Sequence, residues 1–375
     1  MADNPYREML TARAKLYGIR PAGPSFLHLE LGTTHLLHAI DRYRTAWVLE
    51  KEGMPIPAGG MTEIPQQGAD LMPRTAVCIN VLSKEGAEYR VDTPGISSSW
   101  AFAVKAAKEL KAAQFPGHVA PRFVCRMAQS ENLLPFVLGE HCAPIAIPAA
   151  RNGDGAWEIF GDDEIRRMGF TQTARRFQTI NAQLKNVGKG TPLQGRIDER
   201  GKLTKQVFGS EGYLLMAGAG GKHICAACLP LGEAHDIVVD QTLYWKTITS
   251  ETEAWFFVGM LNSRALTQAI MPFNPKGAFG ERHIHALPYR LLPALDGSND
   301  DHLRIAALAQ QVAGITHGLI AADDYLNDPN RALTRRRSRL RAALAQAPQV
   351  KELESLCAAV LGTTGTESAD ETEDE

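Results

Sequence analysis

Guanidinium, ammonium and amide side chains are concentrated between residues 171 and 205. In this segment only Asp198 and Glu199 carry a carboxylate. Arg, Lys, Asn and Gln are the side chains that read base edges and bind phosphates in DNA. The composition therefore predicts a DNA-contacting helix or loop, although an ordinary polar surface explains it equally well. The candidate DNA-binding residues here are Arg175, Arg176, Asn181, Gln183, Lys185, Lys189, Arg196, Lys202 and Lys205.

A second candidate DNA contact lies in the Gly-rich stretch between residues 273 and 288. A role in orienting the surrounding loop is an equally good interpretation. His283 and His285 are two positions apart, so a strand would place both imidazoles on one face. A metal would need a third ligand that the sequence does not identify, so we predict no metal site. The candidate DNA-binding residues here are Lys276, Arg282, His283 and His285.

Six arginines lie between residues 331 and 341. Contact with DNA phosphates is one interpretation of this cluster. We favour a solvated helix face or a contact with a partner subunit, because three leucines lie on the opposite side of the same predicted helix. A lysine-rich segment around residues 100–113 is also interpreted as a solvated helix face. The leucines are Leu333, Leu340 and Leu344, and the lysines are Lys105, Lys108 and Lys111.

No cluster in the sequence predicts a catalytic residue, and neither Ser-His-Asp nor Cys-His catalysis has a local signature. The Gly218–Gly221 cluster is a candidate cofactor turn, which would have to open a helix whose N-terminus meets an anion. Residues Lys222–Leu229 after it have strand character. We therefore expect a hairpin turn, in which Gly supplies positive φ angles. A helix after Gly221 would instead favour an enzyme that binds a cofactor here.

Cys225 and Cys228 have the spacing of a zinc-binding pair. A structural zinc site usually takes two such pairs, and the sequence contains no second one. The odd spacing also places the two thiols on opposite faces of a strand. We therefore expect both to be reduced thiols in the core of a cytosolic protein, where disulfides are rare.

A strand followed by a capped helix is expected between residues 236 and 271. Asp236–Lys246 is β-branched and aromatic, without Gly or Pro, and predicts a strand. Ser250 and Glu253 have the spacing of a capping box, which predicts a helix start, and Pro272 ends the helix. A Gly-rich loop, a short strand and Leu291–Pro293 follow. The apolar face of the helix would consist of Ala254, Phe257, Val258 and Leu261.

Three other motifs each precede a predicted strand. The first is a Gly-Ala-Asp-Leu-Met-Pro-Arg run, the second is Asn-Leu-Leu-Pro-Phe, and the third is Lys-Leu-Thr-Lys-Gln. A further strand is expected over residues 45–49. In order, the motifs and their strands are Gln67–Thr75 with Thr75–Leu82, Asn132–Phe136 with Ala143–Pro148, and Lys202–Gln206 with Gly212–Ala217.

In order and spacing these motifs, over roughly residues 67 to 312, resemble the target-recognition domain of N6-adenine DNA methyltransferases of restriction-modification and phage-defence systems. The specificity subunits of type I restriction enzymes carry a looser version. Asp70 is a departure, because that family usually has Thr at this place. The resemblance implies a module that recognises a sequence in double-stranded DNA. The implied fold is α+β, a strand-rich recognition domain with inserted helices followed by a helical C-terminal segment.

The resemblance also implies methylation chemistry, for which the chain lacks the motifs. N6-adenine methylation needs a Gly-rich turn for S-adenosylmethionine and an Asn/Asp-Pro-Pro-aromatic loop for the flipped adenine. The sequence contains Asn4-Pro5 and Asn274-Pro275, but no Asn-Pro-Pro or Asp-Pro-Pro. We therefore expect no cofactor on this chain. We expect a catalytic methyltransferase subunit or domain as a partner, with S-adenosylmethionine bound there.

Four parts are predicted along the chain. Residues 1–66 form an N-terminal helix and linker region, 67–300 the recognition domain, 301–362 a helical segment and 363–375 a disordered acidic tail. The helical segment would consist of helices over 301–322, 331–347 and 349–361, the first capped by Asp300 or Asp301. A non-DNA scaffold that pairs proteins through these helices is an alternative function.

The net charge of the 375-residue chain is −2. Glu367–Glu375 contains six acids and no base, so the remainder has a net charge of +4. That modest excess does not by itself indicate DNA binding. The sequence has no apolar run of about 18 residues and no secretory signal. We therefore expect a soluble, cytoplasmic protein without a membrane partner.

Overall fold

The computed structural model describes residues 26–31, 34–41, 44–49, 61, 63–94, 114–185, 190–218, 220, 223–271, 276–277, 280–281 and 287–362. For residues 26–49, 276–277 and 280–281 it describes the backbone alone. Helices and several small sheets alternate along this part of the chain, so the fold is α+β, as predicted.

A four-stranded antiparallel sheet packs against a buried helix, α7 (Glu251–Asn262). α7 begins as predicted, because Ser250 Oγ accepts a hydrogen bond from Glu253 N at 3.3 Å. Phe256 and Phe257 are both buried, so α7 is covered on more than one side. The strand predicted over 212–217 is confirmed as β14. The sheet order is β15 (Ala226–Pro230), β14 (Tyr213–Gly218), β17 (Leu243–Ile248) and β4 (Gln66–Gln67).

α7 is shorter than predicted. It ends at Asn262, because Ser263 has an extended backbone with φ −67° and ψ 146°. Ser263 Oγ accepts from Leu266 N at 3.1 Å and begins a new helix, α8 (Arg264–Ile270). The prediction of one helix up to Pro272, which lies outside the described residues, is therefore wrong.

The strand predicted over Asp236–Lys246 is divided between two sheets. Its first part is β16 (Ile237–Val239), which pairs in parallel with β8 (Val124–Ala128). β8 also pairs antiparallel with β11 (Ala143–Ala146), which confirms the strand predicted there. The second part is β17, in the other sheet. A single continuous strand is therefore wrong, because the chain turns at Asp240.

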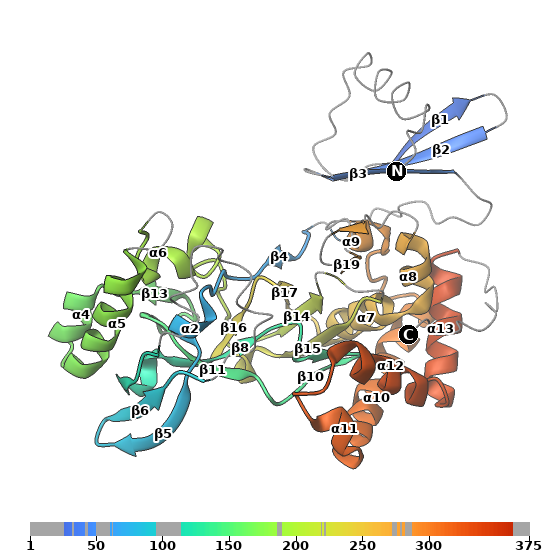
Figure 1. Cartoon of the computed structure of the whole chain (residues 1–375). Coiled ribbons are helices and arrows are strands. Elements are labelled where there is room, and N and C mark those ends of the chain that lie inside the picture. Colours follow the sequence, from blue (N-terminus) through green and yellow to red (C-terminus); the bar gives the residue numbers. More distant parts are fainter. Residues whose placement is uncertain are drawn as a thin grey trace.

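A second apolar cluster contains the buried ring of Phe123, and the helices α4, α5 and α6 beside it form one end of the molecule (Figure 1). The ring of Phe123 meets those of Phe160, Phe170 and Phe177 edge to face, with centroids 5.8, 5.8 and 6.3 Å apart. Small strands and helices surround these rings. They are β5 (Asn80–Glu85), β6 (Glu88–Asp92), β7 (Gly117–Val119), β12 (Ala149–Arg151), β13 (Trp157–Ile159), α4 (Asp162–Arg167), α5 (Thr171–Leu184), α6 (Leu193–Ile197), η2 (Pro121–Phe123) and η3 (Glu199–Gly201).

The strand predicted over Thr75–Leu82 is wrong in its first part. A helical turn, α2 (Arg74–Val77), replaces it, and β5 begins only at Asn80. All four side chains of α2 are buried. A strand points successive side chains to opposite faces, whereas this turn directs four consecutive side chains into the protein.

The predicted C-terminal helices are confirmed within a few residues. They are α10 (Asp300–Ala322), α12 (Leu333–Leu344) and α13 (Pro348–Val360), with a short α11 (Asp324–Asn327) after the first. The cap of α10 is Asn299, whose side chain accepts from the amides of Asp301 and His302. Asp300 and Asp301 are already helical, so neither is the cap residue.

α10 shares one core with α7. A Cβ on Gly259 of α7 would lie 3.0 Å from Ile305 Cγ2 and 3.2 Å from Ala309 Cβ, so this Gly permits a close approach of the two helices. Within the described part of the chain, α10 is one helix with the length and composition of a membrane span. Its residues Ile305, Leu308 and Val312 are nevertheless 0% exposed. α10 is therefore packed into the protein, and the predicted division of the chain between residues 300 and 301 stays a prediction.

The remaining elements include a separate three-stranded sheet. β1 (Phe26–Leu31), β2 (Thr34–Asp41) and β3 (Arg44–Leu49) form an antiparallel meander, which confirms the strand predicted over 45–49. Residues 1–25 of the predicted N-terminal helix and linker region, the helix predicted around residues 100–113 and the acidic tail lie outside the described residues. The other elements are β9 (Leu133–Leu134), β10 (Val137–Leu138), η4 (Leu231–Glu233), β18 (Lys276–Gly277), β19 (Gly280–Glu281) and α9 (Leu287–Leu291).

Candidate nucleic-acid interface

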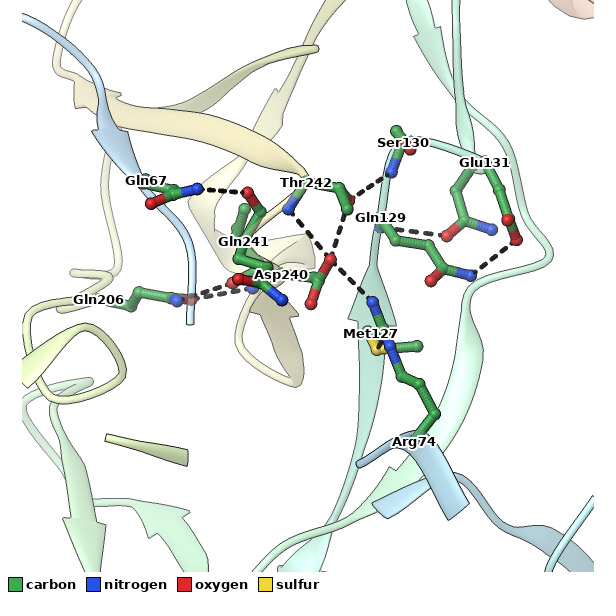
Figure 2. Close-up of polar contacts among 12 residues, drawn as sticks. Gln67, Arg74, Met127, Gln129, Ser130, Glu131, Gln206, Asp240, Gln241 and Thr242 are labelled. Carbon is green, nitrogen blue, oxygen red and sulfur yellow. Dashed lines mark hydrogen bonds and ion pairs between the residues drawn. The ribbon is translucent and has the colours of Figure 1, made fainter. Parts of the chain in front are cut away.

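A buried ion pair lies at the turn that follows β16 (Figure 2). Arg74 Nη2 is 2.8 Å from Asp240 Oδ1, and the two side chains are 4% and 0% exposed. The amide and hydroxyl of Thr242 donate to the same oxygen at 3.0 and 2.8 Å. Arg74 also donates to the sulfur of Met127 on β8. Buried charges need such partners, so these residues fix the turn between the two sheets.

Two distant segments are hydrogen-bonded to the same turn. Gln206 Nε2 donates to Val239 O at 2.8 Å, and its Oε1 accepts from Val239 N at 2.9 Å. Ser130 N donates to Thr242 Oγ1 at 3.0 Å. We refer to Arg74, Ser130, Gln206, Asp240 and Thr242 together as the Asp240 junction.

The Gly-Ala-Asp run passes directly beside the Asp240 junction. A Cβ on Gly68 would lie 2.3 Å from the carbonyl oxygens of Val239 and Asp240, so only Gly fits there. Gly68 N donates to Leu243 O at 3.0 Å. Burial raises the pKa of Asp70, against the attraction of Lys202. Its Oδ1 is buried and has no hydrogen-bond partner among the described residues.

The sequence did not single out Asp240, or Gln206 by itself, as important residues. A usable signal was the polar run Asp240-Gln-Thr242 within an otherwise β-branched and aromatic stretch. A strand buried on both faces is usually continuously apolar. The interruption therefore marked a turn, although its partners Arg74 and Ser130 are far away in the chain.

The predicted DNA-binding residues of α5 have different environments. Arg175, Gln183 and Lys185 are exposed. Arg176 is buried, its Nε donates to Phe115 O at 3.1 Å, and burial lowers its pKa to about 10. The prediction that Arg176 contacts DNA therefore disagrees with its position, because its guanidinium group supports the fold.

Asn181, also on α5, is half-buried. Its Nδ2 donates to Gln194 Oε1 at 3.1 Å and to Asp162 Oδ2 at 3.2 Å, and its Oδ1 accepts from Leu193 N at 2.8 Å. These bonds join α5 to α4 and α6. Asn181 thus holds helices together in this structure, and its predicted contact with DNA stays a prediction.

Of the later candidates, Arg196 is in α6, and Lys202 and Lys205 lie between α6 and β14. Lys202 is half-buried and donates to Gln67 Oε1 at 2.9 Å. Arg196 Nε donates to Thr191 O at 2.8 Å, while exposed Lys205 donates to Arg200 O at 3.2 Å. Lys276 is in β18, where the backbone alone is described. The remaining candidates, Lys189, Arg282, His283 and His285, lie outside the described residues, so their roles stay predictions.

Three arginines of α12 bind main-chain oxygens inside the protein. Arg337 Nη2 donates to Leu133 O at 2.7 Å and to Ser130 O at 2.8 Å. Arg341 Nη2 donates to Ile224 O at 2.6 Å. Arg336 is 5% exposed, and its Nε donates to Leu326 O at 2.9 Å. The predicted solvated face is wrong for these three, because they satisfy carbonyl groups that need partners.

The other three arginines of this cluster are exposed. Arg339 Nε lies 2.7 Å from Asp323 Oδ2, and Arg331 Nε lies 3.1 Å from Asp328 Oδ2. Arg335 is exposed on the same helix. The interpretation as a solvated face therefore holds for Arg331, Arg335 and Arg339.

The strands on either side of the Gly218–Gly221 cluster form a hairpin, as predicted. β14 and β15 pair antiparallel on either side of it, and Gly218 N donates to Cys225 O at 2.9 Å. A strand follows the cluster and not a helix, which contradicts the alternative of a cofactor turn. Cys225, directly before β15, and Cys228, within β15, pack into different apolar clusters, as expected from their spacing. Burial raises the pKa of Cys228 to about 12.

Comparisons with known proteins find similarity among solved structures. No protein-family model matches the sequence, and no curated protein matches it. The chain resembles a solved structure reported as "Structure of Type IIL restriction-modification enzyme MmeI in complex with DNA has implications for engineering of new specificities". The TM-score is 0.45 and the sequence identity 11%, over 91% of this chain and 40% of that chain. The chain thus spans less than half the length of that enzyme.

Proposed function

We propose that this chain is the DNA-binding target-recognition module of a site-specific N6-adenine DNA methyltransferase of a restriction-modification or phage-defence system. In this proposal the chain selects a site in double-stranded DNA. A catalytic subunit or domain binds S-adenosylmethionine and methylates the adenine. The complex would act in the cytoplasm.

The observation that supports the proposal best is the meeting of the sequence motifs at the Asp240 junction. Gln67 Nε2 donates to Gln241 O at 2.9 Å, across a separation of 174 positions. The Lys-Leu-Thr-Lys-Gln motif contributes Gln206, and the segment before Asn-Leu-Leu-Pro-Phe contributes Ser130. Segments that are far apart in the sequence are thus held together in one part of the fold, as the motifs of one recognition domain should be.

The surface chemistry of α5 is a second support. Exposed Arg175, Gln183 and Lys185 offer cationic and amide groups, and residues 171–184 contain no carboxylate. Phosphate contacts supply most of the affinity of DNA-binding proteins, and side chains of these types make them.

The test is a titration of the chain against a labelled DNA duplex at several salt concentrations. We expect the chain to bind the duplex at low salt. The logarithm of the association constant should fall linearly with the logarithm of the salt concentration, with a slope of about 0.9 for each phosphate contact. Heparin is the control polyanion, and unlabelled duplex should compete better than heparin at equal charge. Absence of duplex binding at low salt would contradict the proposal and favour the scaffold alternative.

A further inference from the structure

We propose that α5 is the helix that reads base edges in the major groove of double-stranded DNA. This inference rests on the proposed function and names the surface that selects the site. The reading residues are Gln172, Arg175, Thr179 and Gln183.

These four side chains form one stripe on the solvent face of α5. All four are exposed, and their spacing of three, four and four positions places them on the same side of a helix. The first and last are about 16 Å apart along the axis, at 1.5 Å per residue. A B-DNA major groove, roughly 12 Å wide, admits a helix.

The chemistry of the stripe suits base recognition. An Arg pairs with two acceptors of guanine, a Gln with the acceptor and donor of adenine, and a Thr with either kind of group. Thr179 Oγ1 donates to Arg175 O at 3.0 Å, which leaves its oxygen free to accept. Arg175 also supplies a positive charge to complement phosphate groups.

Two carboxylates that are hydrogen-bonded to residues of α5 lie at its two ends. Glu88 Oε1 accepts from Thr173 Oγ1 at 2.7 Å and from Thr173 N at 3.3 Å, beside the first turn. Asp162 accepts from Asn181 and Gln194 near the last turn. The stripe between these ends contains no acid of its own, so α5 can approach DNA without direct charge repulsion from its own side chains.

The opposite face of α5 is firmly packed. Phe177, Ile180 and Leu184 are 0% exposed. Thr173 Oγ1 accepts from Ala120 N at 2.8 Å, and Arg176 Nε donates to Phe115 O. Base readout requires side chains held on a rigid element, and these contacts provide it. α5 lies at the end of the molecule away from α10, α12 and α13 (Figure 1).

The experiment is a selection of duplexes from a random-sequence pool by the full chain at low salt, followed by sequencing. Arg175→Ala and Gln183→Ala should each relax the selected motif at one position. The preference there should fall by roughly tenfold or more for a lost bidentate contact. Arg175→Lys keeps the charge and loses the planar fork, so it should keep non-specific affinity and still lose the preference.

Arg335→Ala is the matched control, because Arg335 is an exposed arginine on α12, away from α5. It should leave the motif unchanged. Circular dichroism checks that each variant is folded, and the exposed positions chosen make loss of fold unexpected. A motif retained by the α5 variants overturns this inference alone, whereas a chain that binds DNA and selects no motif also overturns the site selection in the proposed function. No binding to any duplex overturns the proposed function together with it.

Discussion

Two Asp–Arg pairs in this protein have similar geometry and different surroundings. Arg74 and Asp240 approach to 2.8 Å with side chains 4% and 0% exposed. Arg126 and Asp236 approach to 2.6 Å, but these side chains are 43% and 32% exposed. Water can replace a lost partner at the second pair and not at the first. The two pairs therefore allow a direct comparison of buried and exposed charge.

Removing the buried carboxylate should destabilise the protein strongly. Asp240→Ala leaves the charged Arg74 in the interior without its carboxylate, which costs about 3–5 kcal/mol of unfolding free energy. Asp236→Ala, the matched control, should cost about 1 kcal/mol or less, as exposed pairs do. Urea denaturation measures both. If both variants lose the same unfolding free energy, the buried Asp240 junction does not stabilise the turn between the two sheets more than an exposed ion pair would.

Asp70 should make stability depend on pH. Burial raises the pKa of Asp70 in the folded chain, so the folded state holds this proton more tightly than the unfolded state does. Its contribution to stability is then lost as pH rises from the unfolded pKa, about 3.9, through the higher folded value. Asp70→Asn should therefore be more stable than the wild type at pH 8, with the difference shrinking toward pH 4. Thermal unfolding at several pH values tests this, and a constant difference across that range would contradict it.

At the scale of elements, short sequence patterns predicted some of the helices and caps that depend on hydrogen bonds between neighbouring residues. Ser250 was recognised as a cap because its partner, Glu253, is three residues away. Asn299, Ser263 and the turn at Asp240 were missed. Ser263 lies inside a pattern that continues across it, and the turn depends on Arg74 and Ser130, which no window of neighbouring residues contains. The C-terminal helices were found because each has its own apolar pattern.

The candidate DNA-binding residues of α5 were predicted from the composition of the segment, and not from the side of the helix on which each residue lies. Arg175 and Arg176 are adjacent, and yet the first is exposed and the second is 3% exposed. Phe177, Ile180 and Leu184 mark the buried side of α5, and Arg176 lies one turn before Ile180 on that side. Helical spacing thus contained the distinction, whereas a count of cations over 171–205 did not.

Two arginines of α12, Arg337 and Arg341, should stabilise the folded protein. Arg337→Ala and Arg341→Ala remove the donors to the carbonyls of Ser130, Leu133 and Ile224, and each should lower the unfolding free energy by about 1–3 kcal/mol. Arg335→Ala, one exposed arginine on the same helix, should change it by about 0.5 kcal/mol or less. Urea denaturation compares the three. If Arg335→Ala proves as damaging as the others, the carbonyl contacts are not the cause.

For the whole molecule, the charge of the acidic tail should oppose non-specific DNA binding. Deleting residues 367–375 changes the net charge from −2 to +4. The truncated chain should therefore bind a duplex more tightly at low salt, and the gain should shrink as salt screens the charges. Fluorescence anisotropy measures this. A control chain of full length, with the six acids changed to their amides, should gain as much, and a gain in the truncated chain alone would rule out an electrostatic cause.

The parallel pairing of β16 with β8 has a consequence for how the chain folds. β8 can pair with β11 soon after both strands have been synthesised. Its other neighbour, β16, is distant in the sequence, since Arg126 of β8 pairs with Ile237 of β16. Pairing across such a separation is slow, because the intervening loop must be ordered first. During synthesis, one edge of β8 therefore stays open until residues 237–239 emerge from the ribosome. A nascent chain stalled before Ile237 exposes that edge to other chains, and open strand edges are where aggregation begins.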